Sequence, residues 1–341
     1  MLILVAAGAL FLWPRPPTIV PVKGLGGGSK SGLLADPDVQ RILRERYRLA
    51  VDYSTSGSLV LGDCKDCDFL WPGNEADVER YRASHGGKVS YDKALQSPLV
   101  LYSWDEVTDA LIKAGLVERE GDTYYLTDVQ GFLTLNAEGK TWKHIGLPQI
   151  FGRAVIISAD PTRADSGNTF AAYIATMRNQ EQVLDRKALA PLLAGVREYF
   201  ANQGYLQPKT KDLWDRYVTA GMGGYPIIVA YESLGIELIQ LLPESERAEV
   251  LAHIRMIYPR PTVWFSHPLI LVTARGKALA DALKDPEIQA IAWKVHGFRS
   301  AVPGIRNDPQ AVDFPGVAGE IISVMPLPPP DVLDRITEYL N

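Results

Sequence analysis

Residues 18–53 read TIVPVKGLGGGSKSGLLADPDVQRILRERYRLAVDY and contain, in order, a strand pattern, a glycine-rich loop, a helix pattern and a second strand pattern. β-Branched residues dominate the first strand pattern, whereas Val39, Ile42 and Leu43 recur at helical spacing. Strands that alternate with helices predict a largely parallel sheet that is covered by helices on both faces. This stretch therefore predicts an α/β fold.

The same alternation continues along the chain. Further strands are predicted at residues 68–71, 98–102, 154–157, 226–230 and 269–272. Helices are predicted at residues 36–48, 104–114, 166–177, 189–203, 211–220, 245–257, 277–283 and 286–295, and a proline-rich spacer at 326–330 precedes a short last helix. With 341 residues, the chain is long enough for two such α/β units.

The composition is that of an average soluble globular protein. At 47% hydrophobic and 22% charged residues, the chain is too polar for a multi-span membrane protein and too apolar for disorder. Its net charge of -5 provides no basic excess that could bind a nucleic-acid backbone. We therefore expect no nucleic-acid partner.

Residues 1–13, MLILVAAGALFLW, form an isolated apolar segment that is ended by the sequence PRPP. A helix that spans a bilayer needs about 20 apolar residues, so this segment is closer in length to the core of a secretory signal. No basic region precedes it, which leaves open a longer signal, the stub of an N-terminal membrane anchor, or a buried helix. We expect residues 1–22 to be a signal or anchor with a spacer, and the protein to be extracytoplasmic, in the periplasm or at the cell surface.

The two cysteines, Cys64 and Cys67, form a single C-x-x-C motif. No second pair is present to complete four zinc ligands, so a zinc site is not expected. A thioredoxin-type redox motif normally opens a helix, whereas FLWP follows here at residues 69–72. A small structural disulfide, or two inert thiols, is favoured over redox catalysis.

Three loops combine hydroxyl groups and glycines at the ends of predicted strands. They read GGGSKSG at residues 26–32, STSGS at 54–58 and DPTRADSGNT at 160–169. Backbone amides between a strand and a helix can bind an anion, and the Arg163 guanidinium could add a planar pair of donors. Each loop alone is also typical of helix caps and turns, and Arg163 could form a surface salt bridge.

Other chemistries find less support. Residues 24–31 nearly match the phosphate-binding loop of nucleotide triphosphatases, but Ser29 stands where that motif has its second glycine. The five histidines are never two or four residues apart, so no helical metal pair is predicted, and no G-x-S-x-G motif is present. We expect no metal, no cofactor and no enzymatic activity.

Taken together, these motifs resemble the bacterial extracellular solute-binding proteins of the type II periplasmic-binding class, in particular the oxyanion-binding branch that includes phosphate and molybdate binders. The resemblance covers about residues 23–304. It is carried by GSKSG at 28–32, STSGS at 54–58, DFLWP at 68–72, PLVL at 98–101, residues 160–169, YES at 231–233 and residues 289–299, which end in GFR. It implies a two-lobed Venus-flytrap fold in which each lobe is a mainly parallel sheet flanked by helices. Residues 23–102 and 263–341 would form lobe I, and residues 103–262 lobe II.

The resemblance also implies a function and a site. The chain would capture a small oxyanion in the cleft between the lobes, for an ABC-type transporter or a sensing partner. In phosphate binders an Arg-x-x-x-Ser-Gly-Thr run holds the anion, and residues 163–169 resemble it with one residue fewer before the serine and one inserted after the glycine. The implied ligand contacts are Ser29, Ser31, Ser56, Ser58, Arg163, Ser166, Gly167, Thr169 and Tyr231, the last as a tyrosine that closes over the cleft. The alternative is a membrane-anchored protein-interaction subunit that keeps this fold but has lost transport.

Overall fold

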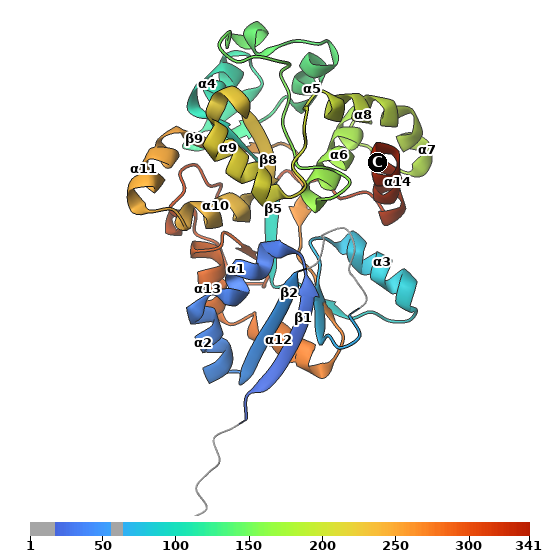
Figure 1. Cartoon of the computed structure of the whole chain (residues 1–341), viewed down its shortest axis with the longest axis vertical. Coiled ribbons are helices and arrows are strands. Elements are labelled where there is room, and N and C mark those ends of the chain that lie inside the picture. The colour runs from blue at the N-terminus through green and yellow to red at the C-terminus, as the bar shows by residue number, and fades with distance from the viewer. Residues whose placement is uncertain (1–17, 56–63) are drawn as a thin grey trace, which may run out of the picture.

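The protein consists of two lobes joined by extended crossings (Figure 1). The computed structural model describes residues 18–55 and 64–341. Of residues 1–22, predicted to be a signal or anchor with a spacer, residues 1–17 lie outside the described residues, as do the candidate contacts Ser56 and Ser58. Within the described ranges, no helix combines the length and the apolar character that are needed to cross a bilayer.

Lobe I contains a five-stranded sheet. Its order is β2 (Leu49–Thr55), β1 (Val20–Gly26), β3 (Phe69–Trp71), β11 (Leu269–Leu271) and β4 (Tyr91–Asp92). Strand β1 pairs in parallel with β2 and β3, whereas β11 runs antiparallel to its two neighbours. The flanking helices are α1 (Ser31–Ala35), α2 (Pro37–Glu45), α3 (Glu75–His85), α12 (Ala274–Ala282) and α13 (Pro286–Lys294). The strand, loop and helix order predicted for residues 18–53 is confirmed.

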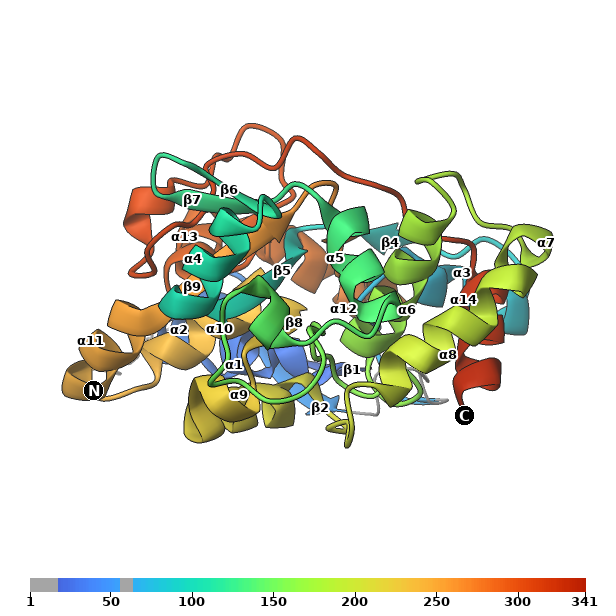
Figure 2. The ribbon, with the colours of Figure 1, turned by 90° about the horizontal axis from the view of Figure 1, so that it is seen from above.

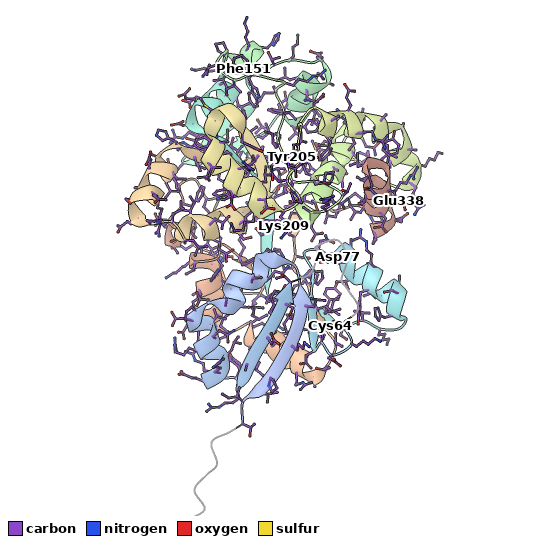
Figure 3. All side chains as sticks on the ribbon, in the orientation of Figure 1. Cys64, Asp77, Phe151, Tyr205, Lys209 and Glu338 are labelled. Carbon is purple, nitrogen blue, oxygen red and sulfur yellow. A yellow bond between two sulfur atoms is a disulfide. The ribbon has the colours of Figure 1, made fainter. Side chains whose placement is uncertain are left out.

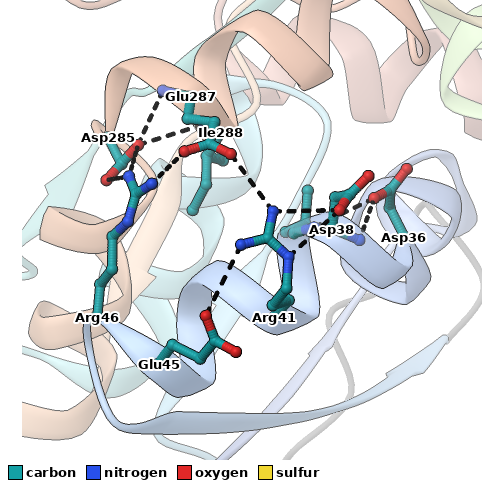
Figure 4. Close-up of polar contacts among 9 residues, drawn as sticks. Asp36, Asp38, Arg41, Glu45, Arg46, Asp285, Glu287 and Ile288 are labelled. Atoms are coloured by element: carbon teal, nitrogen blue, oxygen red, sulfur yellow. Dashed lines mark hydrogen bonds and ion pairs between the residues drawn. The ribbon is translucent and has the colours of Figure 1, made fainter.

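Two capped helices, α2 and α13, pack side by side in lobe I (Figure 4). Asp36 and Asp285 each stand before a proline and accept hydrogen bonds from backbone amides of the first turn. Arg41 on α2 then forms an ion pair with Glu287 on α13. Buried Val39, Ile42 and Leu43 form the inner face of α2, as their spacing predicts.

Lobe II contains a seven-stranded sheet. Its strands are β10 (Trp264–Phe265), β5 (Leu95–Trp104), β9 (Ile254–Pro259), β7 (Thr123–Leu126) and β6 (Val117–Glu120), with β8 (Ile227–Tyr231) and β12 (Arg299–Ser300) also paired to β5. Every strand paired with β5 runs antiparallel to it, and β7 with β9 is a parallel pair. Two sheets flanked by helices are therefore confirmed, but the mainly parallel pairing predicted for this lobe is wrong.

Lobe II has a deeply buried helix, α6, against which other helices of the lobe pack. The helices of this lobe are α4 (Asp105–Lys113), α5 (Val129–Ala137), α6 (Asp165–Arg178), α7 (Arg186–Leu189), α8 (Leu193–Ala201), α9 (Thr210–Gly224), α10 (Glu232–Gln240), α11 (Glu244–His253) and α14 (Pro330–Leu340). All residues of α6 from 165 to 177 are buried, and α5, α8 and α14 pack against this helix. The predicted helix at 245–257 is too long, because β9 begins at Ile254.

The chain passes between the lobes on extended segments, of which β5 is the longest (Figure 1). Leu95 at its start belongs to the core of lobe I, whereas Leu99 already belongs to the core of lobe II. The crossing thus lies a few residues before the predicted boundary at 102. A return crossing connects β10 to β11, and a further one follows α13.

The C-terminal segment is placed differently from the prediction, which assigned all of 263–341 to lobe I. Phe314, Val332, Leu333 and Ile336 fill the same core as α6 in lobe II. Figure 2 shows α14 beside α6 and α8. The apolar face of this last helix therefore completes lobe II.

Candidate functional site

The first hydroxyl-rich loop lies at the carboxyl end of β1 and places Lys30 at the boundary between the lobes. Its side chain is only 1% exposed, and Nζ donates a hydrogen bond to the backbone oxygen of Pro72 at 3.4 Å. Burial lowers the pKa of Lys30 to about 8, although the carboxylates of Asp165 and Asp77 favour its charged form. A buried ammonium that interacts with side chains of both lobes is the centre of the candidate site.

The same loop does not form the phosphate-binding loop of a nucleotide triphosphatase. Gly24 and Gly26, which would belong to that loop, are residues of β1. A Cβ atom at Gly24 would lie 2.1 Å from the Phe69 ring, so this glycine allows two neighbouring strands to pack. The helix that follows is a single turn of five residues.

Asp165 brings lobe II against this loop, because it is the first residue of α6. Its Oδ2 lies 2.9 Å from the position that a Cβ atom on Gly73 of lobe I would occupy. Burial, followed by the charge of Asp77, raises the pKa of Asp165 well above its ordinary value. Asp77, on α3, is itself buried and forms an ion pair with Arg80 at 2.5 Å. Figure 3 shows Asp77 at the edge of lobe I that faces lobe II.

Three hydroxyl groups of lobe II meet beside Asp165. Ser166 Oγ lies 2.6 Å from Thr210 Oγ1, and the Tyr231 hydroxyl is hydrogen-bonded to Ser166. Burial raises the pKa of Tyr231 well above its ordinary value, so this hydroxyl keeps its proton and can donate it to a hydrogen bond. Its ring meets the Phe265 ring edge-on, with centroids 4.4 Å apart.

Some buried polar atoms at this boundary have no hydrogen-bond partner among the described residues. They include Ser31 Oγ, Asp77 Oδ2 and both ring nitrogens of His267. His267 lies on the crossing between β10 and β11, where its backbone oxygen accepts a hydrogen bond from Trp71 Nε1 at 2.8 Å. Burial, and then the charge of Lys30, lower the pKa of His267 well below its ordinary value. A buried polar atom without a partner costs about 1–3 kcal/mol, so these atoms indicate a place where a small polar molecule binds.

The residues predicted as ligand contacts fall into two groups. Ser31, Ser166 and Tyr231 lie at the inter-lobe boundary with Lys30, and half-buried Ser29 directly precedes Lys30. Gly167 and Thr169 are buried within α6, where a Cβ atom on Gly167 would lie 2.3 Å from Ala159 O.

Arg163 lies in a more exposed place than the anion-binding prediction implies. Its side chain is 68% exposed, and its Nε is 3.8 Å from Asp160 Oδ2. The role predicted for it stays a prediction.

Sequence reasoning missed Lys30, Asp77, Asp165 and His267 as members of the site. A signal for Lys30 and Asp165 was present in the sequence, because they directly precede the predicted contacts Ser31 and Ser166. Their burial depends on contacts between the two lobes, which no local pattern reports.

The chemistry available here is hydrogen bonding and charge. In the described parts of the chain, no cluster of three His, Cys, Asp or Glu side chains could hold a metal ion.

An open groove of 540 Å³ lies on the boundary between the lobes. It is lined by α3 and residues 324–330, with Trp264 in its wall. Cys64 and Cys67 form a disulfide in lobe I, which is one of the two states that the sequence left open (Figure 3 labels Cys64).

Comparisons with known proteins bear on the fold. No family model matches the chain, and no curated protein matches it. Solved structures do match. Apo ferric ion-binding protein A of Pasteurella haemolytica is 13% identical, with 94% of this chain and 95% of that one covered and a TM-score of 0.58. A periplasmic thiamin-binding protein is 8% identical, with 94% of this chain and 96% of that one covered and a TM-score of 0.56. The sulfate-binding protein SubI of Mycobacterium tuberculosis H37Rv is also similar, at 15% identity, with 84% of this chain and 88% of that one covered and a TM-score of 0.52. These structures are named as binding proteins rather than enzymes. The chain therefore has the two-lobed fold of the periplasmic solute-binding proteins.

Proposed function

We propose that this chain is an extracytoplasmic solute-binding protein that captures a small anion between its lobes and presents it to an ABC-type transporter or a sensing partner. The observation that carries the proposal is the buried Lys30 ammonium, together with Ser31 Oγ and the His267 ring nitrogens, which are buried and have no hydrogen-bond partner among the described residues. The names of similar folds, which refer to sulfate, ferric ion and thiamin, support solute capture in general.

The mechanism would be closure around the ligand. Lys30 and Ser31 approach from lobe I, and Ser166 and Tyr231 approach from lobe II. Because donors from both lobes contact the ligand only when the lobes are together, ligand binding favours the closed arrangement. No covalent bond changes.

Two buried carboxylic acids, Asp77 and Asp165, restrict the charge that the ligand can carry. Asp77 and Asp165 would repel an anion if both were ionised, but burial raises the pKa of each. A neutral carboxyl can donate a hydrogen bond, so an anion next to Asp165 is compatible with a proton on that group. We therefore expect a small ligand with one or two negative charges rather than a large polyanion.

The disulfide supports the proposed location, because disulfides persist in oxidising compartments. The remaining predicted contacts, Ser29, Ser56, Ser58, Arg163, Gly167 and Thr169, are secondary candidates for substitution.

Thermal-shift measurements with phosphate, sulfate, molybdate and small carboxylates test the proposal. We expect at least one anion to raise the melting temperature of the wild-type chain, and Lys30→Met to abolish that rise. Lys277→Met is the matched control, because Lys277 is exposed and pairs with Asp281 on α12. An anion response that Lys30→Met leaves intact would count against Lys30 as the centre of the site.

A further inference from the structure

A second polar contact joins the lobes, and it is centred on His296 at the end of α13. Its Nδ1 lies 2.7 Å from Glu237 Oε1 on α10 of lobe II, and its Nε2 lies 3.2 Å from Asp36 Oδ2 of lobe I. The three side chains are largely buried, with 7% of His296 and 14% of each carboxylate exposed. His296 thus bridges two carboxylates that belong to different lobes.

Glycines allow α10 to come this close. A Cβ atom on Gly32 would lie 1.8 Å from Glu237 Oε1, and one on Gly297 would lie 2.7 Å from Ile236 Cβ. Gly32 ends the same Gly-Ser-Lys-Ser-Gly run that contains Lys30. The contact at His296 and the candidate ligand site therefore share one loop of lobe I.

Asp36 is held in a fixed position. Its Oδ1 accepts hydrogen bonds from the amides of Asp38 and Val39 at 2.9 and 3.1 Å and so caps α2, which leaves Oδ2 to face the His296 ring. An ionised carboxylate only accepts hydrogen bonds, and a neutral imidazole has one N–H group. With both carboxylates ionised, both contacts are hydrogen bonds only when both ring nitrogens carry a proton.

Other charged groups on the elements around the ring have partners elsewhere. On α10, Glu232 is bound by Arg299, and on α2 and α13, Asp38 and Glu287 both pair with Arg41. Lys294 on α13 is exposed, and α1 has no charged residue. Asp36 and Glu237 are therefore the charged side chains that contact the His296 ring.

We propose that Asp36, His296 and Glu237 form a proton-dependent clasp between the lobes, which holds them together when the imidazole is doubly protonated. The closed arrangement then binds one more proton than an arrangement with the lobes apart. By linkage, the closed population falls as the pH rises through the range in which histidine titrates, between about 5 and 8. The equilibrium constant for closing decreases by at most about tenfold per pH unit. Its consequence for a ligand, tighter capture at acidic pH, rests on the proposed function.

The clasp is tested without any ligand, by small-angle X-ray scattering of the chain at about pH 5.5 and about pH 8. We expect the radius of gyration to increase with pH in the wild type. In Glu237→Gln the amide can either donate or accept, so the second ring proton is no longer needed and the pH dependence should disappear. Asp105→Asn is the matched control, because it removes a histidine–carboxylate contact of 2.9 Å to His253 that lies entirely within lobe II.

A radius that does not change with pH in the wild type, or a change that persists in Glu237→Gln, would overturn the clasp. A measurement that needs no variant is the set of ring ¹⁵N shifts of His296, which should report two protonated nitrogens whenever scattering reports the closed form. A ring with one proton in the closed form contradicts the proposal. Because no solute takes part, these results are independent of whether an anion binds beside Lys30.

Discussion

Arg299 and Glu232 form a bidentate ion pair where the chain crosses between the lobes. Arg299 Nε lies 2.6 Å from Glu232 Oε2, and Nη2 lies 2.7 Å from Oε1. The Tyr258 hydroxyl also donates to Glu232 at 2.5 Å, and Glu232 is fully buried. The pair thereby connects β12, which pairs with the start of the crossing strand β5, with the first turn of α10 in lobe II.

Removing one member of this pair should destabilise the protein strongly. Arg299→Met leaves a buried carboxylate without its cation, which costs about 3–5 kcal/mol, whereas the double variant with Glu232→Leu should recover much of that loss. Urea unfolding measures both. Arg186→Met is the control, because its ion pair with Asp331 is exposed and is worth less than about 1 kcal/mol. Equal losses in Arg299→Met and Arg186→Met would contradict this account.

A methyl group at Gly32 should displace the Glu237 carboxylate from His296. The added Cβ would overlap Glu237 Oε1, and the side chain can turn away without moving α10, so Gly32→Ala is expected to weaken the pH dependence of the radius of gyration. Gly28→Ala in the same loop is the matched control, because nothing lies within 4 Å of the added atom. A pH dependence in Gly32→Ala that equals that of the wild type would contradict the contact between Glu237 and His296.

The buried Lys30 should make stability depend on pH in the alkaline range. Its pKa is about 8 in the folded chain, whereas an unfolded lysine titrates near 10.4, so the unfolded chain binds more protons between these values. The free energy of unfolding of the wild type should therefore rise with pH from about 8 to about 10, relative to Lys30→Met, by up to about 1.4 kcal/mol per pH unit. Unfolding curves at several pH values measure the difference. Parallel profiles for the two proteins would show that Lys30 is not buried.

The disulfide should contribute modestly to stability. Cys64 and Cys67 are three residues apart, and closing so short a loop stabilises the fold by roughly 2 kcal/mol in the chain-entropy model. The double variant Cys64→Ser and Cys67→Ser is expected to unfold at lower urea concentration by that amount and to keep any anion response. Thiol counting on the non-reduced wild type should find no free cysteine, and two free thiols would refute the pairing.

Elements with local signals were predicted well from the sequence. The helix predicted at 286–295 corresponds to α13, because Asp285 caps it, Pro286 begins it and its apolar residues recur at helical spacing. Strand β1 and helix α2 of lobe I were predicted from signals of the same kind, because β-branched residues dominate the strand pattern and the apolar residues of the helix recur at helical spacing. The apolar run at 154–157 was wrongly predicted as a strand, since only Ile157 forms a bridge, to Ile228.

Features that depend on contacts between distant segments could not be predicted. Residues 254–257 continue a helical pattern, yet they pair with β5, some 150 residues earlier in the chain. The C-terminal helix joins lobe II because α6 offers it an apolar face. The burial of Lys30, Asp165 and His267 likewise arises where the lobes meet. Charge and hydroxyl content therefore led to the loops that contain Lys30 and Asp165, but not to the buried ionisable groups themselves.

Isothermal titration calorimetry tests the central claim, that an anion binds between the lobes at Lys30, most directly. Wild-type protein freed of small molecules by unfolding and refolding should bind one of phosphate, sulfate, molybdate or a small carboxylate at a single site. Lys30→Met should lose that binding heat, while Lys277→Met should keep it. The absence of saturable heat with every one of these anions at about pH 5.5, where the clasp favours closure, would contradict the account.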